Sequence, residues 1–138
     1  MKTTKKILKD LVYQVNGAAI EVHKALGPGL LESVYHKCMK HELRFRRINF
    51  TSEHIIPLKY KGIEINCDLR CDLLVESMLA VELKAVKEIL PIHEAQLLTY
   101  MKLLKSPEGL MINFNTTNIF HEGQRTYVSE LYYNLIDR

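Results

Sequence analysis

The chain has 138 residues and a formal net charge of +3, with 47% hydrophobic and 25% charged residues. This length and composition are typical of a globular protein with enough chain to bury a core, and we expect a single domain over residues 1–138. The small positive charge is compatible with nucleic-acid binding but does not indicate it alone. No apolar run reaches the roughly 20 residues needed to span a bilayer, which argues against membrane insertion.

The cysteines and the N-terminus indicate the cellular compartment of the protein. Cys38, Cys67 and Cys71 form no C-x-x-C pair, and their spacing is typical of neither a zinc site nor a disulfide framework. The first residues include lysines but no apolar segment, so we expect no signal peptide. Reduced thiols in a cytoplasmic protein are the expectation.

The N-terminal third is predicted to be helical. Apolar residues recur every three to four positions over residues 4–26, which predicts a long amphipathic helix ending at Gly27-Pro28-Gly29. A second helical pattern begins near Leu31 and ends near Arg47. Glu32 lies in the first turn of this helix, where a helix N-terminus favours a carboxylate.

The middle of the chain is predicted to be extended. Residues 50–60 alternate as a strand, and Pro57 indicates an edge strand or a bulge because proline donates no ladder hydrogen bond. Residues 63–68 are predicted to return as a strand after a turn at Lys61-Gly62 and could run on to Val75. A strand over residues 79–85 follows.

The C-terminal third alternates between helix and strand. Pro91 opens a predicted helix that ends at residues 106–109, and residues 110–114 are apolar enough for a strand buried on both faces. Residues 119–120 and 125–128 are predicted as peripheral strands, and residues 130–136 as a short terminal helix. A hairpin followed by a helical crossover into another strand gives an α/β fold with a mixed sheet flanked by helices.

The segment Arg70–Lys84, R-C-D-L-L-V-E-S-M-L-A-V-E-L-K, carries the candidate chemistry. It is interpreted as two apolar strands joined by a three-residue turn at residues 76–78. Glu82 and Lys84 share a strand face, and Asp72 joins them if it lies opposite Glu82. A slip of one residue would move Asp72 to the other face.

Two carboxylates on one face repel each other unless a proton or a cation lies between them. A hard divalent cation such as Mg²⁺ or Mn²⁺ is the usual solution, because it prefers oxygen ligands. Without further information, a structural salt bridge among Asp72, Glu82 and Lys84 is the favoured alternative.

Three motifs in order resemble the GxxExxY protein family of the PD-(D/E)xK nuclease superfamily. They are G-L-L-E-S-V-Y at Gly29–Tyr35, R-C-D-L-L-V-E, and V-E-L-K-A-V. The resemblance extends from about Val15 to Phe114 and also includes Q-L-L-T-Y at residues 96–100, which fits the Q-x-x-x-Y motif of RecB-like members. Where the family has proline before the aspartate, this chain has Cys71.

The resemblance implies a restriction-endonuclease-like αβββαβ core, preceded here by an extra N-terminal helix, and a divalent-metal nuclease site. By correspondence of motifs, Asp72 and Glu82 would bind Mg²⁺ or Mn²⁺, with Lys84 as the motif lysine. Glu32 would complete the metal shell or orient a bound water. Gln96 would contact a ligand water, the phosphate or the lysine, and the set of implied catalytic residues is Asp72, Glu82, Lys84, Glu32 and Gln96.

Three further residues are candidates for substrate binding. Tyr100 shares a helix face with Gln96 and would position the phosphate backbone. Arg70 is two residues before Asp72, so on a strand both side chains lie on the same face. Arg70 would contact phosphate or pair with an acid. Tyr35 would contact substrate, but core packing with a buried hydroxyl hydrogen bond is at least as well supported by its place on the apolar stripe.

The expected function is therefore hydrolysis of phosphodiester bonds in nucleic acid, DNA in preference to RNA. The principal alternative is a non-catalytic member of the same fold that binds nucleic acid or a protein. A second alternative is an assembly subunit whose apolar edge, around Pro57, supports a homodimer.

Overall fold

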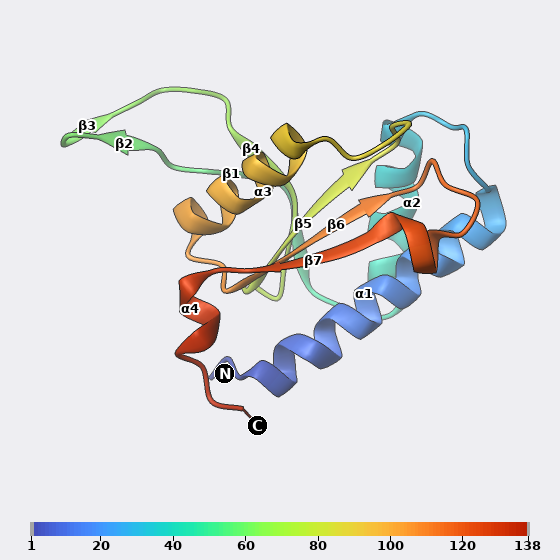
Figure 1. Cartoon of the computed structure of the whole chain (residues 1–138), viewed down its shortest axis with the longest axis horizontal. Coiled ribbons are helices and arrows are strands. Elements are labelled where there is room, and N and C mark those ends of the chain that lie inside the picture. The colour runs from blue at the N-terminus through green and yellow to red at the C-terminus, as the bar shows by residue number, and fades with distance from the viewer. Residues whose placement is uncertain (1, 138) are drawn as a thin grey trace.

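The computed structural model describes residues 2–137 (Figure 1). Its elements follow in the order α1 (Lys5–Leu26), α2 (Glu32–Phe45), β1 (Phe50–Ile55), β2 (Lys59–Tyr60), β3 (Ile63–Glu64), β4 (Arg70–Val75), β5 (Leu79–Lys84), α3 (Pro91–Leu104), β6 (Glu108–Asn113), the π-helix η1 (Ile119–Gly123), β7 (Gln124–Val128) and α4 (Glu130–Tyr133).

Five strands form one mixed sheet in the order β1-β4-β5-β6-β7. Strands β5 and β6 are parallel and are joined by the crossover helix α3, whereas each of the other neighbouring pairs is antiparallel. The predicted αβββαβ core corresponds to α2, β1, β4, β5, α3 and β6, with α1 as the extra N-terminal helix. The predicted α/β, restriction-endonuclease-like fold is confirmed.

Helices cover both faces of the sheet, and each face has its own apolar cluster. On one side, the stripe of α1 and the inner side chains of α2 pack on residues such as Leu73, Val81 and Leu110. On the other side, Leu97, Tyr100 and Met101 of α3 pack on Ala80 and Met111. Strand β6 is buried throughout, as expected for a central strand with helices on both faces.

Local capping explains where α1 begins and ends. The Thr4 hydroxyl oxygen accepts a hydrogen bond from the Ile7 amide at 3.1 Å, which satisfies one free donor of the first turn. At the other end, Gly27 has a φ of 72°, and its amide donates to the His23 carbonyl at 2.7 Å. The helix therefore stops at the glycine that the sequence predicts, and the chain turns towards α2.

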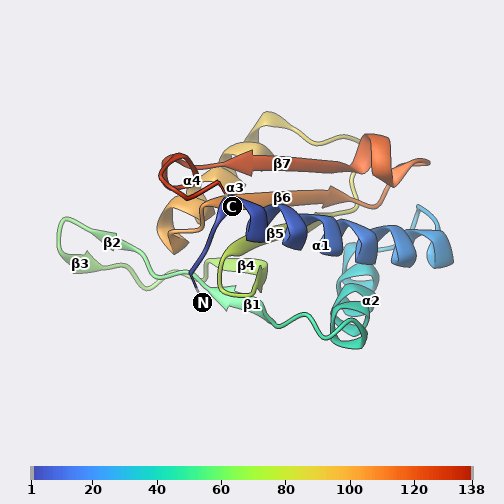
Figure 2. The same ribbon diagram turned by 90° about the horizontal axis from the view of Figure 1, so that it is seen from below.

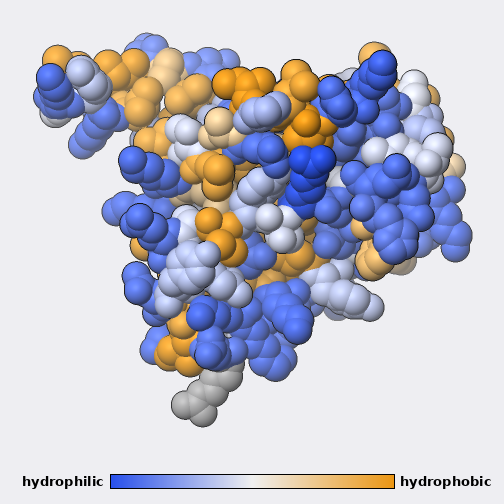
Figure 3. Space-filling model, in the orientation of Figure 1, coloured by the Kyte–Doolittle hydropathy of each residue, from blue (hydrophilic) through white to orange (hydrophobic). Residues whose placement is uncertain are grey.

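A two-stranded arm leaves the body of the protein between β1 and β4. Strands β2 and β3 pair only with each other within the described residues, and the arm projects from the main sheet in both ribbon views (Figures 1 and 2). Polar and apolar side chains are mixed on its surface (Figure 3). Tyr60 and Ile63 are 62% and 65% exposed, so the arm adds little to either apolar cluster.

The predicted strand boundaries are partly wrong around this arm. The expected strand over residues 50–60 breaks after Ile55, and Pro57 lies in the connection rather than in an edge strand. The expected strand over residues 63–68 is only two residues long. The edges of the main sheet are β1 and β7, and β1 ends at the exposed Ile55 two residues before Pro57.

The C-terminal region contains one further correction. Residues 119–120, predicted as strand, belong to η1, whose start is capped by the Asn118 carboxamide oxygen, an acceptor for the His121 amide at 3.2 Å. Strand β7 and helix α4 are as predicted, although α4 is shorter. None of the helices within residues 2–137 combines the length and apolar character needed to cross a bilayer.

Candidate active site

The register of the β4–β5 hairpin is the one that the sequence predicts. Leu73 pairs with Val81 and Val75 with Leu79, which leaves residues 76–78 as the turn. Continuing the same register places Asp72 opposite Glu82. The side chains of Leu73, Val75, Val81 and Leu83 lie in the cluster beneath α1 and α2, on the opposite side from Ala80.

Beyond the Leu73–Val81 pair, hydrogen bonds from main-chain amides to side-chain carboxylates join β4 and β5 in place of the regular main-chain pairing. The Asp72 amide donates a hydrogen bond to Glu82 Oε2 at 3.0 Å, and the Leu83 amide donates to Asp72 Oδ2 at 2.8 Å. Each carboxylate therefore bonds to the main chain of the neighbouring strand. This arrangement holds the two acids side by side and leaves one oxygen of each carboxyl group outside these two bonds.

Strand β1 is also irregular at this point. Ser52 pairs with Leu73 and His54 with Cys71, but Glu53, which would oppose Asp72, has a φ of 49° in the left-handed region. Such a conformation costs a non-glycine residue on the order of 1 kcal/mol or more. Cys71 packs in the α3-side cluster whereas Leu73 packs on the other side, so β4 changes face at Asp72.

Burial and charge both act on Glu82. The side chain is 4% exposed, and desolvation together with the Asp72 charge and a hydrogen bond between the two carboxyl groups raises the pKa of Glu82 to about 9. Lys84 acts in the opposite direction. A buried pair of acids that shares a proton is a place where a cation could take the position of that proton.

Lys84 ends β5 two residues after Glu82 and is half-buried. Its strand continues in register with β6, where Asn113 lies beside Lys84. The buried Asn113 carboxamide accepts from the Val86 amide at 3.1 Å and donates to the Val86 carbonyl at 2.9 Å. Asn113 therefore fixes the segment that follows the lysine. This role was not predicted from the sequence, although an asparagine within the apolar run L-M-I-N-F indicates a buried polar side chain with hydrogen-bond partners.

Glu32 begins α2 and is exposed to solvent. Burial raises the pKa of Glu32, the Asp72 charge raises it further, and Lys84 lowers it, so the carboxylate lies within electrostatic range of the pair. Within residues 2–137, however, no three His, Cys, Asp or Glu side chains lie close enough together to hold a metal ion. Glu32 therefore interacts with the carboxyl pair through charge, and its place in a three-acid metal set stays a prediction.

Helix α3 contributes the residues of the Q-x-x-x-Y pattern. Tyr100 is 7% exposed, and burial followed by the charges of Glu82, Cys71 and Asp72 raises the pKa of Tyr100. Tyr100 therefore lies near the carboxyl pair from the α3 side. Gln96 is one turn earlier on the helix and is exposed to solvent. The charges that act on Tyr100 support its place near the site, and the role of Gln96 stays a prediction.

The other two candidates for substrate contact, Tyr35 and Arg70, have hydrogen-bond partners within the chain. Tyr35 is fully buried, its hydroxyl donates to the Gly27 carbonyl at 2.6 Å and accepts from the Leu30 amide at 3.1 Å, and its ring stacks on Phe114. It holds the loop before Glu32, which is the packing role that the sequence analysis gave as the alternative for Tyr35. Arg70 is exposed and donates to Asp68 Oδ1 at 2.7 Å, so it pairs with an acid.

The comparisons with known proteins identify the family of this site. A family model described as the PD-(D/E)XK nuclease superfamily matches residues 9–126. The chain belongs to this superfamily. A search of curated proteins and a search of solved structures found no match. Membership points to a nuclease with a nucleic-acid substrate, and the match spans all the acids and the lysine described above.

The carboxyl pair of this superfamily member fits a divalent cation. Its donors are hard oxygen atoms, and the positive charge of Lys84 acts on Glu82. The Asp72 and Leu83 amides donate hydrogen bonds that orient the two carboxyl groups. Groups that ligate metal ions are commonly oriented by such hydrogen bonds. The residues present therefore suit Mg²⁺ or Mn²⁺ better than a soft, thiolate-binding metal.

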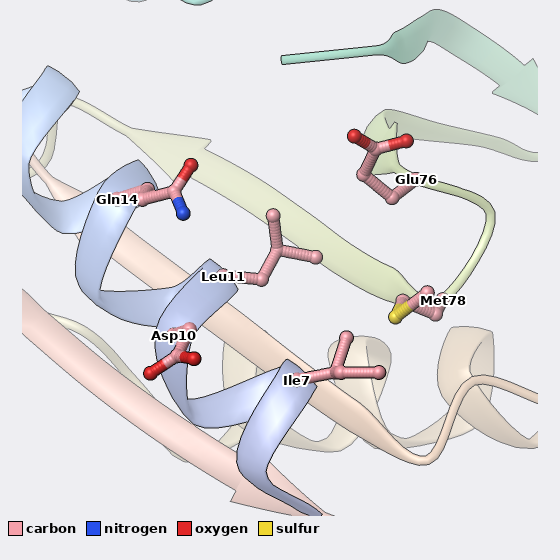
Figure 4. A pocket seen from close by; sticks show the side chains of 6 residues that line it. All are labelled: Ile7, Asp10, Leu11, Gln14, Glu76 and Met78. Carbon is pink, nitrogen blue, oxygen red and sulfur yellow. The ribbon is translucent and has the colours of Figure 1, made fainter. Parts of the chain in front are cut away.

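A second hollow contains acids but lacks this chemistry. It has a volume of about 230 Å³ and lies between α1 and the β4–β5 turn, where Leu11 points towards Met78 and Asp10 points away to another side of the helix (Figure 4). Asp10 is exposed and bonds to Lys6 at 3.0 Å. Its walls combine three apolar side chains with Gln14 and Glu76, and we assign no catalytic role to this hollow.

Proposed function

We propose that this superfamily member is a divalent-metal-dependent nuclease that hydrolyses phosphodiester bonds with Mg²⁺ or Mn²⁺ and acts on DNA in preference to RNA. The observation that carries the proposal is the pairing of Asp72 with Glu82 through the main chains of β4 and β5, with Lys84 two residues further on. This is the aspartate, glutamate-x-lysine order for which the superfamily is named.

The roles follow from the position of each group. When bound, the ion supplies Lewis-acid polarisation of the phosphate and an acidified water. Asp72 and Glu82 would hold it through the oxygen atoms that their main-chain hydrogen bonds leave free. The Lys84 ammonium would orient the attacking water or offset the negative charge that develops on the phosphoryl oxygens.

Residues from two helices would support this pair. Glu32, at the start of α2, would orient a water or approach the ion once a cation offsets its repulsion from Asp72. Tyr100 would position the phosphate backbone from α3, and Gln96 would contact a ligand water or the phosphate. Tyr35 is left out because its hydroxyl has two partners within the chain. Arg70 bonds to Asp68 through Nε alone, and its terminal N–H groups would contact phosphate.

A non-catalytic member of the same fold is the second candidate. One observation favours it: the hydrogen bonds of Asp72 and Glu82 also join β4 to β5 where the ladder stops, which is a structural role that needs no metal. In that case the acids would stabilise the hairpin, and the protein would bind nucleic acid or a protein partner without cleaving it.

A cleavage assay distinguishes the two candidates. The purified protein is incubated with Mg²⁺ or Mn²⁺ and with single-stranded, double-stranded and branched DNA and RNA. We expect cleavage that EDTA and Asp72→Asn abolish, whereas Asp10→Asn, an exposed acid paired with Lys6, leaves it unchanged. Absence of cleavage in all substrates, together with equal Mn²⁺ affinity of wild type and Asp72→Asn, would exclude the nuclease.

Several finer assignments belong to the same proposal. Within the superfamily, the motif Gly29–Tyr35 supports the GxxExxY family and residues 96–100 support a RecB-like pattern. We further propose one domain over residues 1–138 and a cytoplasmic location. A homodimer would use one of the sheet edges, β1 or β7.

A further inference from the structure

A row of basic side chains follows α2 away from the carboxyl pair. His36, Lys40 and Arg44 succeed one another at four-residue steps and so lie next to each other on the helix surface. The row begins one turn after Glu32, whose pKa is affected by Asp72 and Lys84. Its first member is therefore near the proposed site of chemistry, and its last member is near the end of α2.

Contacts with β1 show which way this row faces. His36 Nε2 and Ser52 Oγ are 3.1 Å apart, and the Arg44 guanidinium lies over the Phe50 ring at 5.3 Å. Ser52 pairs with Leu73, the residue after Asp72, and Phe50 pairs with Val75. The row on α2 and the edge strand β1 therefore form one face, which starts beside the carboxyl pair and leads away from it.

The far end of this face is a basic hollow of about 340 Å³. It lies where the chain leaves α2 and turns into β1 (Figure 2), and its lining includes Arg44, Arg47, Asn49 and Ser52. Arg44 and Arg47 are exposed, and no salt bridge to either is found within residues 2–137. The hollow thus presents two guanidinium groups to solvent beside neutral polar side chains, a combination suited to a phosphate group.

Arg46 lies between these two arginines in sequence but not in space. Its Nε donates to Glu42 at 2.8 Å, and its Nη2 donates to the Gly17 carbonyl of α1 at 3.4 Å. It therefore faces the other side of α2 with its charge already paired. Arg44 and Arg47 can therefore be compared with Arg46, because the first two line the hollow and Arg46 is paired with Glu42 outside it.

We propose that the α2–β1 face binds the phosphate backbone of the nucleic-acid substrate on one side of the bond to be cleaved, with Arg44 and Arg47 holding a phosphate at its far end. The inference rests on the proposed nuclease function for its orientation. Twelve residues separate Glu32 from Arg44, or about 18 Å of helix. At about 3.4 Å per base pair, this distance corresponds to roughly five base pairs of duplex.

Binding in EDTA tests this face without cleavage. The affinity of a fluorescent DNA duplex is measured by anisotropy over a series of salt concentrations for wild type, Arg44→Gln, Arg47→Gln, the double variant and Arg46→Gln. We expect the double variant to bind about ten-fold or more weakly and its salt slope to fall by about one, for the one phosphate that the two arginines hold. Arg46→Gln should match wild type, and circular dichroism confirms that each variant is folded.

The length of the duplex gives a second readout. The two arginines should lose their effect when the duplex is cut to fewer than about five base pairs on the side that the face contacts, because no phosphate then reaches the hollow. Equal loss of affinity in all three single variants, no loss in any, or no binding by wild type would overturn the inference. Cleavage by wild type is measured separately. The nuclease function can therefore be confirmed when the proposed role of this face is wrong, and this face can be confirmed when cleavage is absent.

Discussion

Asp72 and Glu82 are each held by the main chain of the opposite strand, through bonds of 2.8 Å from the Leu83 amide and 3.0 Å from the Asp72 amide. The two bonds complete the end of the hairpin where regular pairing stops. They also bring two acids together in a buried position, where they repel each other when both are ionised. The same two bonds therefore stabilise the hairpin and create a position for a cation.

Binding of Mn²⁺ should release a proton. Burial and the neighbouring Asp72 raise the pKa of Glu82 to about 9, so at pH 7 this carboxyl group is protonated and must ionise to bind the ion. Calorimetric titration in two buffers with different protonation enthalpies should give different heats, corresponding to up to about one proton for each ion. Glu82→Gln should give weak binding, and equal heats for wild type in both buffers would contradict the prediction.

The metal-free protein should lose stability as pH rises because of Glu82. Its pKa is higher in the folded protein than in the unfolded chain, so between pH 4.5 and about 9 the folded state binds more protons and the free energy of unfolding falls with pH. Urea unfolding in EDTA should show this fall for wild type and a smaller one for Glu82→Gln. Parallel pH profiles of the two proteins would show that the prediction is wrong.

Replacing Lys84 should impair catalysis more than folding. Lys84 lies two residues after Glu82, and its charge lowers the pKa of that carboxyl group. Loss of one group that stabilises transition-state charge typically lowers kcat about 10²–10³-fold. Lys84→Ala is compared with Lys87→Ala, which removes an exposed lysine three residues further on. Equal rates for the two variants in the cleavage assay would remove Lys84 from the mechanism.

Tyr35→Phe should destabilise the protein although it removes only one oxygen atom. The hydroxyl is buried and serves both the Gly27 carbonyl and the Leu30 amide, so we expect a loss of about 1–2 kcal/mol in the free energy of unfolding. Stacking of the ring on Phe114 would remain. Tyr13→Phe, at a side chain that is 80% exposed, is the control and should have no effect in urea unfolding.

The arm should tolerate polar substitutions. Tyr60 and Ile63 pair with each other in β2 and β3 and are more than half exposed, so Tyr60→Ser with Ile63→Ser should change the free energy of unfolding by no more than about 0.5 kcal/mol. Light scattering of both proteins shows whether the arm also affects the oligomeric state. A loss of several kcal/mol in thermal or urea unfolding would mean that the arm packs against the body.

Local sequence patterns determined most of the secondary structure and the central pairing. The apolar spacing of residues 4–26 and the Gly27-Pro28-Gly29 stop define α1 because helix period and capping are local properties. The hairpin register was predictable as well, since only one alignment buries Leu73 with Val81 while placing Asp72 beside Glu82. The order of acid, glutamate and lysine needed only the sequence.

Tertiary structure decided what no local pattern contains. The change of face at Asp72, the electrostatic coupling of Glu32 to Asp72 and the burial of the Tyr35 hydroxyl all depend on segments distant in the chain. The different partners of Arg44 and Arg46 do so too, because a charged side chain is free or paired according to which element packs beside it. Sequence fixes which groups are present; packing fixes their distances, and electrostatic interactions depend on distance.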